Sequence, residues 1–183
     1  VSNVTNMQGM FSYRYVGGIL KKCIFNSYIG NWDVSKVTDM SHMFASNQSF
    51  NQNIGSWNVS GVTTMYDMFG NATSFNQPLN NWNVSNVTEM WVMFAGASSF
   101  NQPLSGWNVS NVTNMSGMFD SAISFNQDIS SWNVSNVTNM SYMFAGTPYF
   151  NQPLSGWNVS NVTNMQGMFS YRYVGGILKK CIF

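Results

Sequence analysis

The 183-residue sequence is poor in charge, because Asp, Glu, Lys and Arg together make up only 7% of it. An ordinary soluble domain has about 25%, so Asn, Ser and Thr must provide most of the surface that meets water. Apolar residues reach 44% and aromatic residues 16%, which is enough material for a core and argues against a disordered chain. We therefore expect one folded domain with a polar but uncharged surface.

The few charges are unevenly placed. All six acids and one base, Lys36, lie between residues 26 and 170, whereas the other six bases lie in two copies of one segment. These bases are Arg14, Lys21, Lys22, Arg172, Lys179 and Lys180. No basic stripe follows the body of the chain, so nucleic acid is not an expected partner.

The sequence also lacks an apolar run long enough to span a bilayer and a basic-then-apolar leader. It begins at Val1 in the middle of a repeat, so we expect a processed product or a fragment of a longer protein. The two cysteines, Cys23 and Cys181, occupy equivalent places in the basic segments. At opposite ends of a rod they would be too far apart to bridge, since a disulfide needs Cα atoms within about 7 Å. Free thiols are expected, and an intermolecular bridge is the alternative.

What the sequence does contain is one unit written six times. Its Trp recurs at a constant step of 25 residues, at Trp32, Trp57, Trp82, Trp107, Trp132 and Trp157. All 14 Met belong to a Met-x-x-Met-Phe group. A period between 20 and 50 residues is typical of a solenoid, in which each unit buries its apolar residues against its neighbours.

Within the unit WNVSNVTNMSGMF, residues 107–119, the apolar residues follow two spacings. Trp107 and Val109 are two apart, as on one face of a strand, whereas Met115 and Met118 are three apart, as on a short α or 3₁₀ helix. A Ser or Asn between the two segments is expected to cap the helix. The predicted fold is a repeat solenoid over residues 1–183, with about six 25-residue coils that each hold one short parallel strand and one short helical segment.

An Asn follows the loop Phe in every unit, at Asn26, Asn51, Asn76, Asn101, Asn126 and Asn151. We expect these side chains to point inward and to form a ladder of hydrogen bonds between coils. A buried amide without partners would cost about 1 to 3 kcal/mol, so the ladder is the expected arrangement.

The period fails at residues 12–24 and 170–182, which are identical basic insertions. Each holds two β-prone runs around Gly-Gly, which predicts a β-hairpin with a tight primed turn; a disordered loop is the alternative. Residues 159–183 repeat residues 1–25 letter for letter. Neither end carries a capping element, so end-to-end self-association is expected.

The stretch FNQPLSGWNVSNVTNMSGMF, residues 100–119, resembles the 25-residue repeat of mycoplasma lipoproteins and of BspA-like leucine-rich-repeat surface proteins. The resemblance covers nearly the whole chain apart from the two insertions. It implies a leucine-rich-repeat-like solenoid, an extracellular position at the cell surface, and adhesion to a protein or glycan of a host or neighbouring cell. It supplies no catalytic residues.

The acids scatter around the unit, so no catalytic site, metal or cofactor is predicted. Only His42 and Asp67 share a position in neighbouring units, as an exposed ion pair rather than a catalytic dyad. The Met-x-x-Met spacing could hold Cu(I), but the adjoining Phe favours core filling. The Asn-Val-Ser and Asn-Val-Thr sequons favour structural roles over glycosylation at every coil, and an ice-binding surface is a further alternative.

Two functions remain. In the first, a concave strand face adheres to a protein or glycan through the candidate residues Asn58, Asn83, Asn108, Asn133, Ser85 and Ser110. Asn108 is the residue of its unit for which no structural role is predicted. In the second, the protein is a structural subunit that stacks end to end into a filament, with the bases of the insertions against the acidic body of a neighbour.

Overall fold

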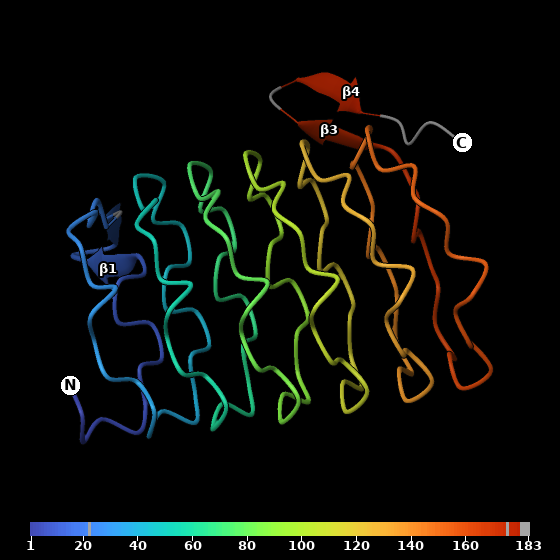
Figure 1. Cartoon of the computed structure of the whole chain (residues 1–183). Coiled ribbons are helices and arrows are strands. Elements are labelled where there is room, and N and C mark those ends of the chain that lie inside the picture. The colour runs from blue at the N-terminus through green and yellow to red at the C-terminus, as the bar shows by residue number, and fades with distance from the viewer. Residues whose placement is uncertain (22, 175, 180–183) are drawn as a thin grey trace.

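The computed structural model describes residues 1–21, 23–174 and 176–179. The chain winds into coils that stack side by side, from the blue coil that holds the N-terminus to the orange coils at the other side (Figure 1). Isolated parallel bridges join successive coils, as Asn6↔Asp39, Asp39↔Thr64, Thr64↔Glu89, Glu89↔Asn114, Asn114↔Asn139 and Asn139↔Asn164. The step is 25 residues except for the first, which spans 33 because residues 12–24 carry an insertion.

Backbone hydrogen bonds tie each interior coil to both neighbours. The N–H of Thr113 donates to the carbonyl oxygen of Thr88 in the preceding coil at 3.0 Å. Two residues later, the N–H of Met115 donates to Asn139 in the following coil, also at 3.0 Å. Backbone groups that point along the stack are thereby satisfied by adjacent coils.

The interior consists of aromatic and aliphatic side chains that touch their copies in the next coil. The ring centroid of Phe94 lies 5.5 Å from that of Phe69 and 5.7 Å from that of Phe119, within the usual range for aromatic pairs. The ring of Trp107 is also buried, and its indole N–H donates to the carbonyl oxygen of Leu79 at 2.9 Å. The core is therefore continuous along the stack.

The local structure inside a coil differs from the prediction. Residues 107–109 are in no strand, and residues 116–121 form consecutive turns; the described part of the chain has no helix. Gly117 and Ser121 both have a φ of 59°, in the left-handed region that a right-handed helix excludes. Because the N–H of Gly117 donates to Ser141 of the next coil at 2.8 Å, it has no helical partner. The Met spacing instead reflects a turn that Met118 N–H closes on Met115 at 3.2 Å.

The four strands of the described residues belong to the two insertions. They are β1 (Arg14–Val16), β2 (Ile19–Lys21), β3 (Arg172–Val174) and β4 (Ile177–Lys179). β1 pairs with β2, and β3 with β4, both antiparallel and in the same register. Between β1 and β2, Gly17 and Gly18 have φ values of 58° and 75°, which suits a primed hairpin turn. The second hairpin lies at the upper edge of the stack (Figure 1).

The Asn ladder is confirmed. Oδ1 of Asn101 accepts the backbone N–H of Asn126 at 3.0 Å and the side-chain N–H of Gln127 at 2.9 Å. The backbone bond recurs at the other steps of the ladder. The ladder side chains are half-buried or exposed, however, so the prediction that they point inward is wrong. The ladder satisfies loop backbone at the surface.

Candidate functional site

The predicted strand-face asparagines form a row on the surface. Asn58, Asn83, Asn108 and Asn133, here named the amide row, are exposed, and each follows a buried Trp. Oδ1 of each accepts the N–H of the Ser two residues later, at 3.1 to 3.2 Å. This bond makes an Asx turn, so the prediction that Asn108 lacks a structural role is wrong. Its Nδ2 has no hydrogen-bond partner among the described residues.

Asp33 shows that a carboxylate supports the same turn. It follows Trp32 as Asn108 follows Trp107. Its Oδ1 accepts the hydroxyl of Ser35 at 2.6 Å and the backbone N–H of Ser35 at 3.1 Å. These two hydrogen bonds, the hydroxyl bond first, lower the pKa of Asp33 because they stabilise its charged form. The position therefore accepts either Asn or Asp.

The candidate serines are half-buried and bond to neighbouring groups of the protein. The Ser85 hydroxyl donates to Oδ1 of Asn83 at 2.7 Å, and the Ser85 carbonyl accepts Nδ2 of Asn111 at 2.7 Å. The carbonyl of Ser110 accepts Nδ2 of Asn136 at the same distance. Asn111 therefore joins two coils and does not cap a helix. Ser85 and Ser110 support the amide row, and the amides present the outward donors.

Arg172 of the second insertion bonds within its own chain. Its Nη2 donates to Oδ2 of Asp120 at 3.0 Å, and its guanidinium lies 4.5 Å from the ring centroid of Tyr142, a cation–π geometry. The filament hypothesis placed this side chain against a neighbouring molecule. Of the other predicted contact residues, Arg14, Lys21 and Lys179 lie in strands β1, β2 and β4, and Lys22 and Lys180 lie outside the described residues.

His42 and Asp67 meet across neighbouring coils. Nδ1 of His42 lies 2.8 Å from Oδ2 of Asp67, and the two side chains are 25% and 22% exposed. The pair is thus more buried than the predicted surface ion pair. Burial raises the pKa of Asp67, and the hydrogen bond with His42 opposes that rise.

An aromatic cluster beside this pair was missed from the sequence. The ring of Tyr66 stacks on that of Trp91, with centroids 3.7 Å apart, and its centroid lies 4.2 Å from that of the His42 ring in an edge-to-face arrangement. All three side chains are half-buried. Trp91 is the one Trp that falls outside the 25-residue phase, and that departure is the signal that could have located the cluster.

The described residues hold no group of three His, Cys, Asp or Glu side chains that could bind a metal ion. No helix in the same part of the chain has the length and apolar character to cross a membrane. Met115 and Met118 are fully buried, which suits core filling. Cys23 is half-buried and free, and Cys181 lies outside the described residues.

One protein-family model matches the chain twice, over residues 1–104 and 77–174. No curated protein and no solved structure matches it. The two overlapping matches confirm the tandem repeat and the mycoplasma-type part of the resemblance. The chain therefore belongs to the family described as "Mycoplasma protein of unknown function, DUF285".

Proposed function

We propose that this protein is a non-catalytic surface protein that adheres to a protein or glycan of a host or neighbouring cell. The proposal includes a BspA-like, leucine-rich-repeat-like solenoid as the architecture and an extracellular position. The observation that carries it is the amide row. Four exposed amides repeat at the same place in successive coils, each fixed by an Asx turn.

The geometry of the amide row suits an extended polar ligand. Parallel bridges join the coils, which implies a separation of about 4.8 Å between equivalent residues. Each amide is already held by its own backbone, so a ligand does not have to pay the full cost of ordering it. A protein segment or glycan chain that lies along the stack could accept hydrogen bonds from several Nδ2 groups at once.

The acids support a non-catalytic function, because each of them bonds to a different group of the chain. Paired carboxylates that act on one substrate would have to converge on it. The acids with these bonds are Asp33, Asp39, Asp67, Glu89, Asp120 and Asp128. Their partners are hydroxyl, backbone, His and Arg groups of the same chain.

The test is a triple variant, Asn83→Asp, Asn108→Asp and Asn133→Asp. Asp keeps the Oδ1 acceptor of the turn, as Asp33 does naturally, but replaces the outward N–H donors with negative charge. We expect binding of labelled protein to cultured animal cells to fall at least about tenfold, since each lost hydrogen bond contributes on the order of 1 kcal/mol. Circular dichroism should show an unchanged fold.

A matched triple, Asn114→Asp, Asn139→Asp and Asn164→Asp, adds the same charge at another repeated position, six residues after Asn108, Asn133 and Asn158. Asp39 occupies that position naturally and accepts the N–H of Ser41 at 2.8 Å. This control should bind cells as the wild type does. Equal binding by all three proteins would contradict the proposal. Electron microscopy of the same samples tests the alternative, an end-to-end structural subunit, which long uniform fibres would support.

A further inference from the structure

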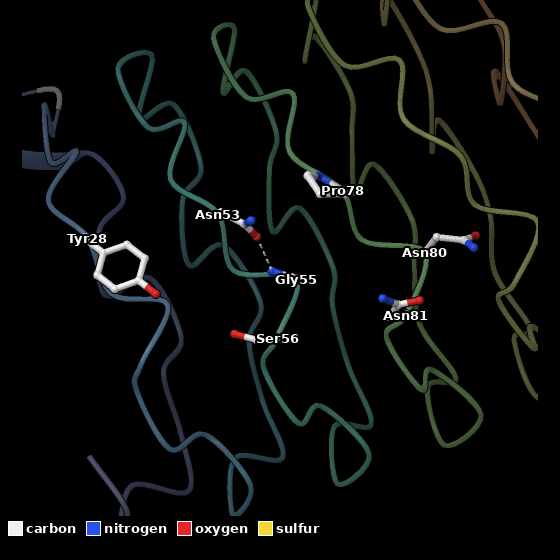
Figure 2. Close-up of a pocket in the computed structure, with 7 residues that line it drawn as sticks. All are labelled: Tyr28, Asn53, Gly55, Ser56, Pro78, Asn80 and Asn81. Carbon is white, nitrogen blue, oxygen red and sulfur yellow. Dashed lines mark hydrogen bonds between the residues drawn. The ribbon is translucent and has the colours of Figure 1, made fainter.

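A groove on the surface of the first coils departs from the repeat pattern. It has a volume of about 480 Å³ and is lined by Tyr28, Asn53, Gly55, Ser56, Pro78, Asn80 and Asn81. These residues come from three successive coils (Figure 2). The groove, named here the Tyr28 groove, contains no member of the amide row and no residue of the basic insertions.

Tyr28 is the aromatic wall of this groove and is specific to its coil. The equivalent residues of the later coils are Asn53, Pro78, Pro103, Asp128 and Pro153. The Tyr28 side chain is 64% exposed, so most of its surface is available to a ligand. A Cβ added to Gly30 would lie only 2.8 Å from two atoms of Tyr28. The glycine therefore provides the space in which the phenol packs beside the backbone.

Amide and hydroxyl groups face Tyr28 across the groove. Oδ1 of Asn53 accepts the N–H of Gly55 at 3.0 Å, which fixes this amide and leaves its Nδ2 unpaired among the described residues. Ser56 donates its hydroxyl to the Gly30 carbonyl at 3.1 Å, so its oxygen lone pairs can still accept. Asn81 is exposed, with no hydrogen-bond partner in the part of the chain that the structure describes. Figure 2 shows Ser56, on the second coil, between Tyr28 on the first coil and Asn81 on the third.

Asn80 and Asn81 are a second departure from the pattern. The residues before Trp82 are Asn-Asn, where the units before Trp107 and Trp157 have Ser-Gly. Asn80 points away from Tyr28 (Figure 2), and its Oδ1 accepts the N–H of Gly106 at 2.8 Å. Asn80 is thus structural, whereas Asn81 places a free amide in the groove.

The composition of the groove selects a class of ligand. No charged side chain lines it, so it offers a phosphate or carboxylate no counter-ion. An aromatic face with a few convergent amides and hydroxyls suits a ligand that is apolar on one face and rich in hydroxyls at its edge. A pyranose ring has this form, with C–H groups on its face and hydroxyls around it. We infer that the Tyr28 groove binds a neutral pyranose residue of a glycan.

In this arrangement the sugar ring lies against Tyr28, and its hydroxyls accept from Asn53 and Asn81 and donate to Ser56. The inference rests on the proposed adhesive function in that it names a glycan as one ligand, but it uses different residues. The probes are methyl glycosides of glucose, galactose and N-acetylglucosamine, with a sialic acid glycoside as the charged comparison. Saturation-transfer difference NMR on the full chain measures their binding.

Tyr28→Asn introduces the residue that Asn53 supplies in the next coil, so the turn should be preserved. We expect it to weaken binding of the best neutral glycoside about tenfold, which is the contribution of one aromatic contact. Asn81→Ser, the residue present at Ser56 and Ser131, should also weaken binding. Tyr149→Ser removes another exposed Tyr, 60% exposed and outside the groove, and should leave binding unchanged.

The inference fails if the wild type binds no neutral glycoside, if Tyr28→Asn binds as the wild type does, or if the sialic acid glycoside binds best. The two proposals can fail separately. Loss of cell adhesion in the amide-row triple without any sugar binding would keep the adhesive function and remove the groove. Sugar binding that depends on Tyr28, together with unchanged cell adhesion in the triple, would keep the groove and remove the amide row.

Discussion

Two rows of residues in the same turns of the coil contrast in how much they vary. The interior row is Phe in five successive coils, at Phe44, Phe69, Phe94, Phe119 and Phe144. Two residues before each Phe, the row named here the turn row holds five different residues: His42, Asp67, Val92, Gly117 and Tyr142. Yet the backbone of the turn row hardly varies, since its φ values lie between 48° and 59°.

The difference shows that two separate constraints act on one segment. In the Phe row each ring touches its copies on both sides, so the side chain itself is constrained. In the turn row each N–H donates to the next coil, as Val92 does to Ser116 at 2.8 Å. That hydrogen bond fixes the backbone in a left-handed conformation even where Val or Tyr disfavours it. Side-chain identity at the turn row is therefore free to vary.

The largest effect is expected in the Phe row. Phe94→Ala should lower the free energy of unfolding by about 3 to 5 kcal/mol, because it leaves a cavity between rings that lie 5.5 and 5.7 Å away. Chemical denaturation measures this loss. Val92→Ala, two residues earlier, is the control and should cost less than about 1 kcal/mol. Similar losses in both variants would mean that the two rows are not distinct.

The Asn ladder lies between these extremes, because its residue is fixed although its side chain is partly exposed. Asn101→Ala should cost about 1 to 3 kcal/mol, since the N–H of Asn126 and the amide of Gln127 both lose their acceptor. Asn101→Asp keeps that acceptor and should cost less. If Asn101→Ala melted at the wild-type temperature, water would be replacing the ladder bond at no cost.

A reciprocal pair of variants tests whether the neighbouring coil sets the turn-row backbone. Gly117→Val should destabilise by about 1 to 2 kcal/mol, the cost of a left-handed conformation for a residue with a Cβ. Its Cβ would also lie 2.9 Å from Cγ1 of Val92. Val92→Gly relieves the same strain but loses packing and adds chain entropy, so we expect a stabilisation of less than about 1 kcal/mol. A loss of stability in Val92→Gly, measured by thermal melting, would argue against stored strain.

The sequence predicted the buried residues well because Trp, Met and Phe keep their phase in every unit, as Trp82 and Phe94 show. It did not predict the turns. A spacing of three between Met115 and Met118 arises equally from a helix and from a turn closed by one hydrogen bond, and only the next coil decides between them. Gly117 was a cue to a left-handed residue, but Val92 and Tyr142 conceal it in their units.

The candidate binding surfaces show the same limit. Periodicity located the amide row but could not show that the Oδ1 atom of Asn108 is occupied by a backbone N–H. The Tyr28 groove required residues from three coils to be placed together. Its cue in the sequence was Tyr28, at a position of the repeat that holds Asn, Pro or Asp in the later coils. Such departures from the repeat can be interpreted only when it is known which positions of neighbouring coils are adjacent in space.

The smallest effect concerns charge in the turn row. Burial raises the pKa of Asp67 above its ordinary value of 3.8, so the folded protein holds this proton more tightly than the unfolded chain. Stability is therefore lost as pH rises from about 4 through the raised pKa, and acid restores it. Asp67→Asn removes the ionisation and keeps a residue suited to the left-handed turn, as Asn71 shows with a φ of 54°. We expect it to be more stable than the wild type at pH 7 by less than about 1 kcal/mol, and equal to it below pH 4.

Asp128→Asn is the matched control with the opposite sign. Hydrogen bonds from Ser130 lower the pKa of Asp128, so its charged form stabilises the folded state above the ordinary pKa, and that contribution is lost as pH falls. Denaturation at pH 7 and well below pH 4 should therefore give Asp67→Asn a gain, and Asp128→Asn a loss or no change, at the higher pH. A gain in Asp67→Asn that persisted well below pH 4 would be assigned to the turn conformation, because residue 67 is then uncharged in both proteins.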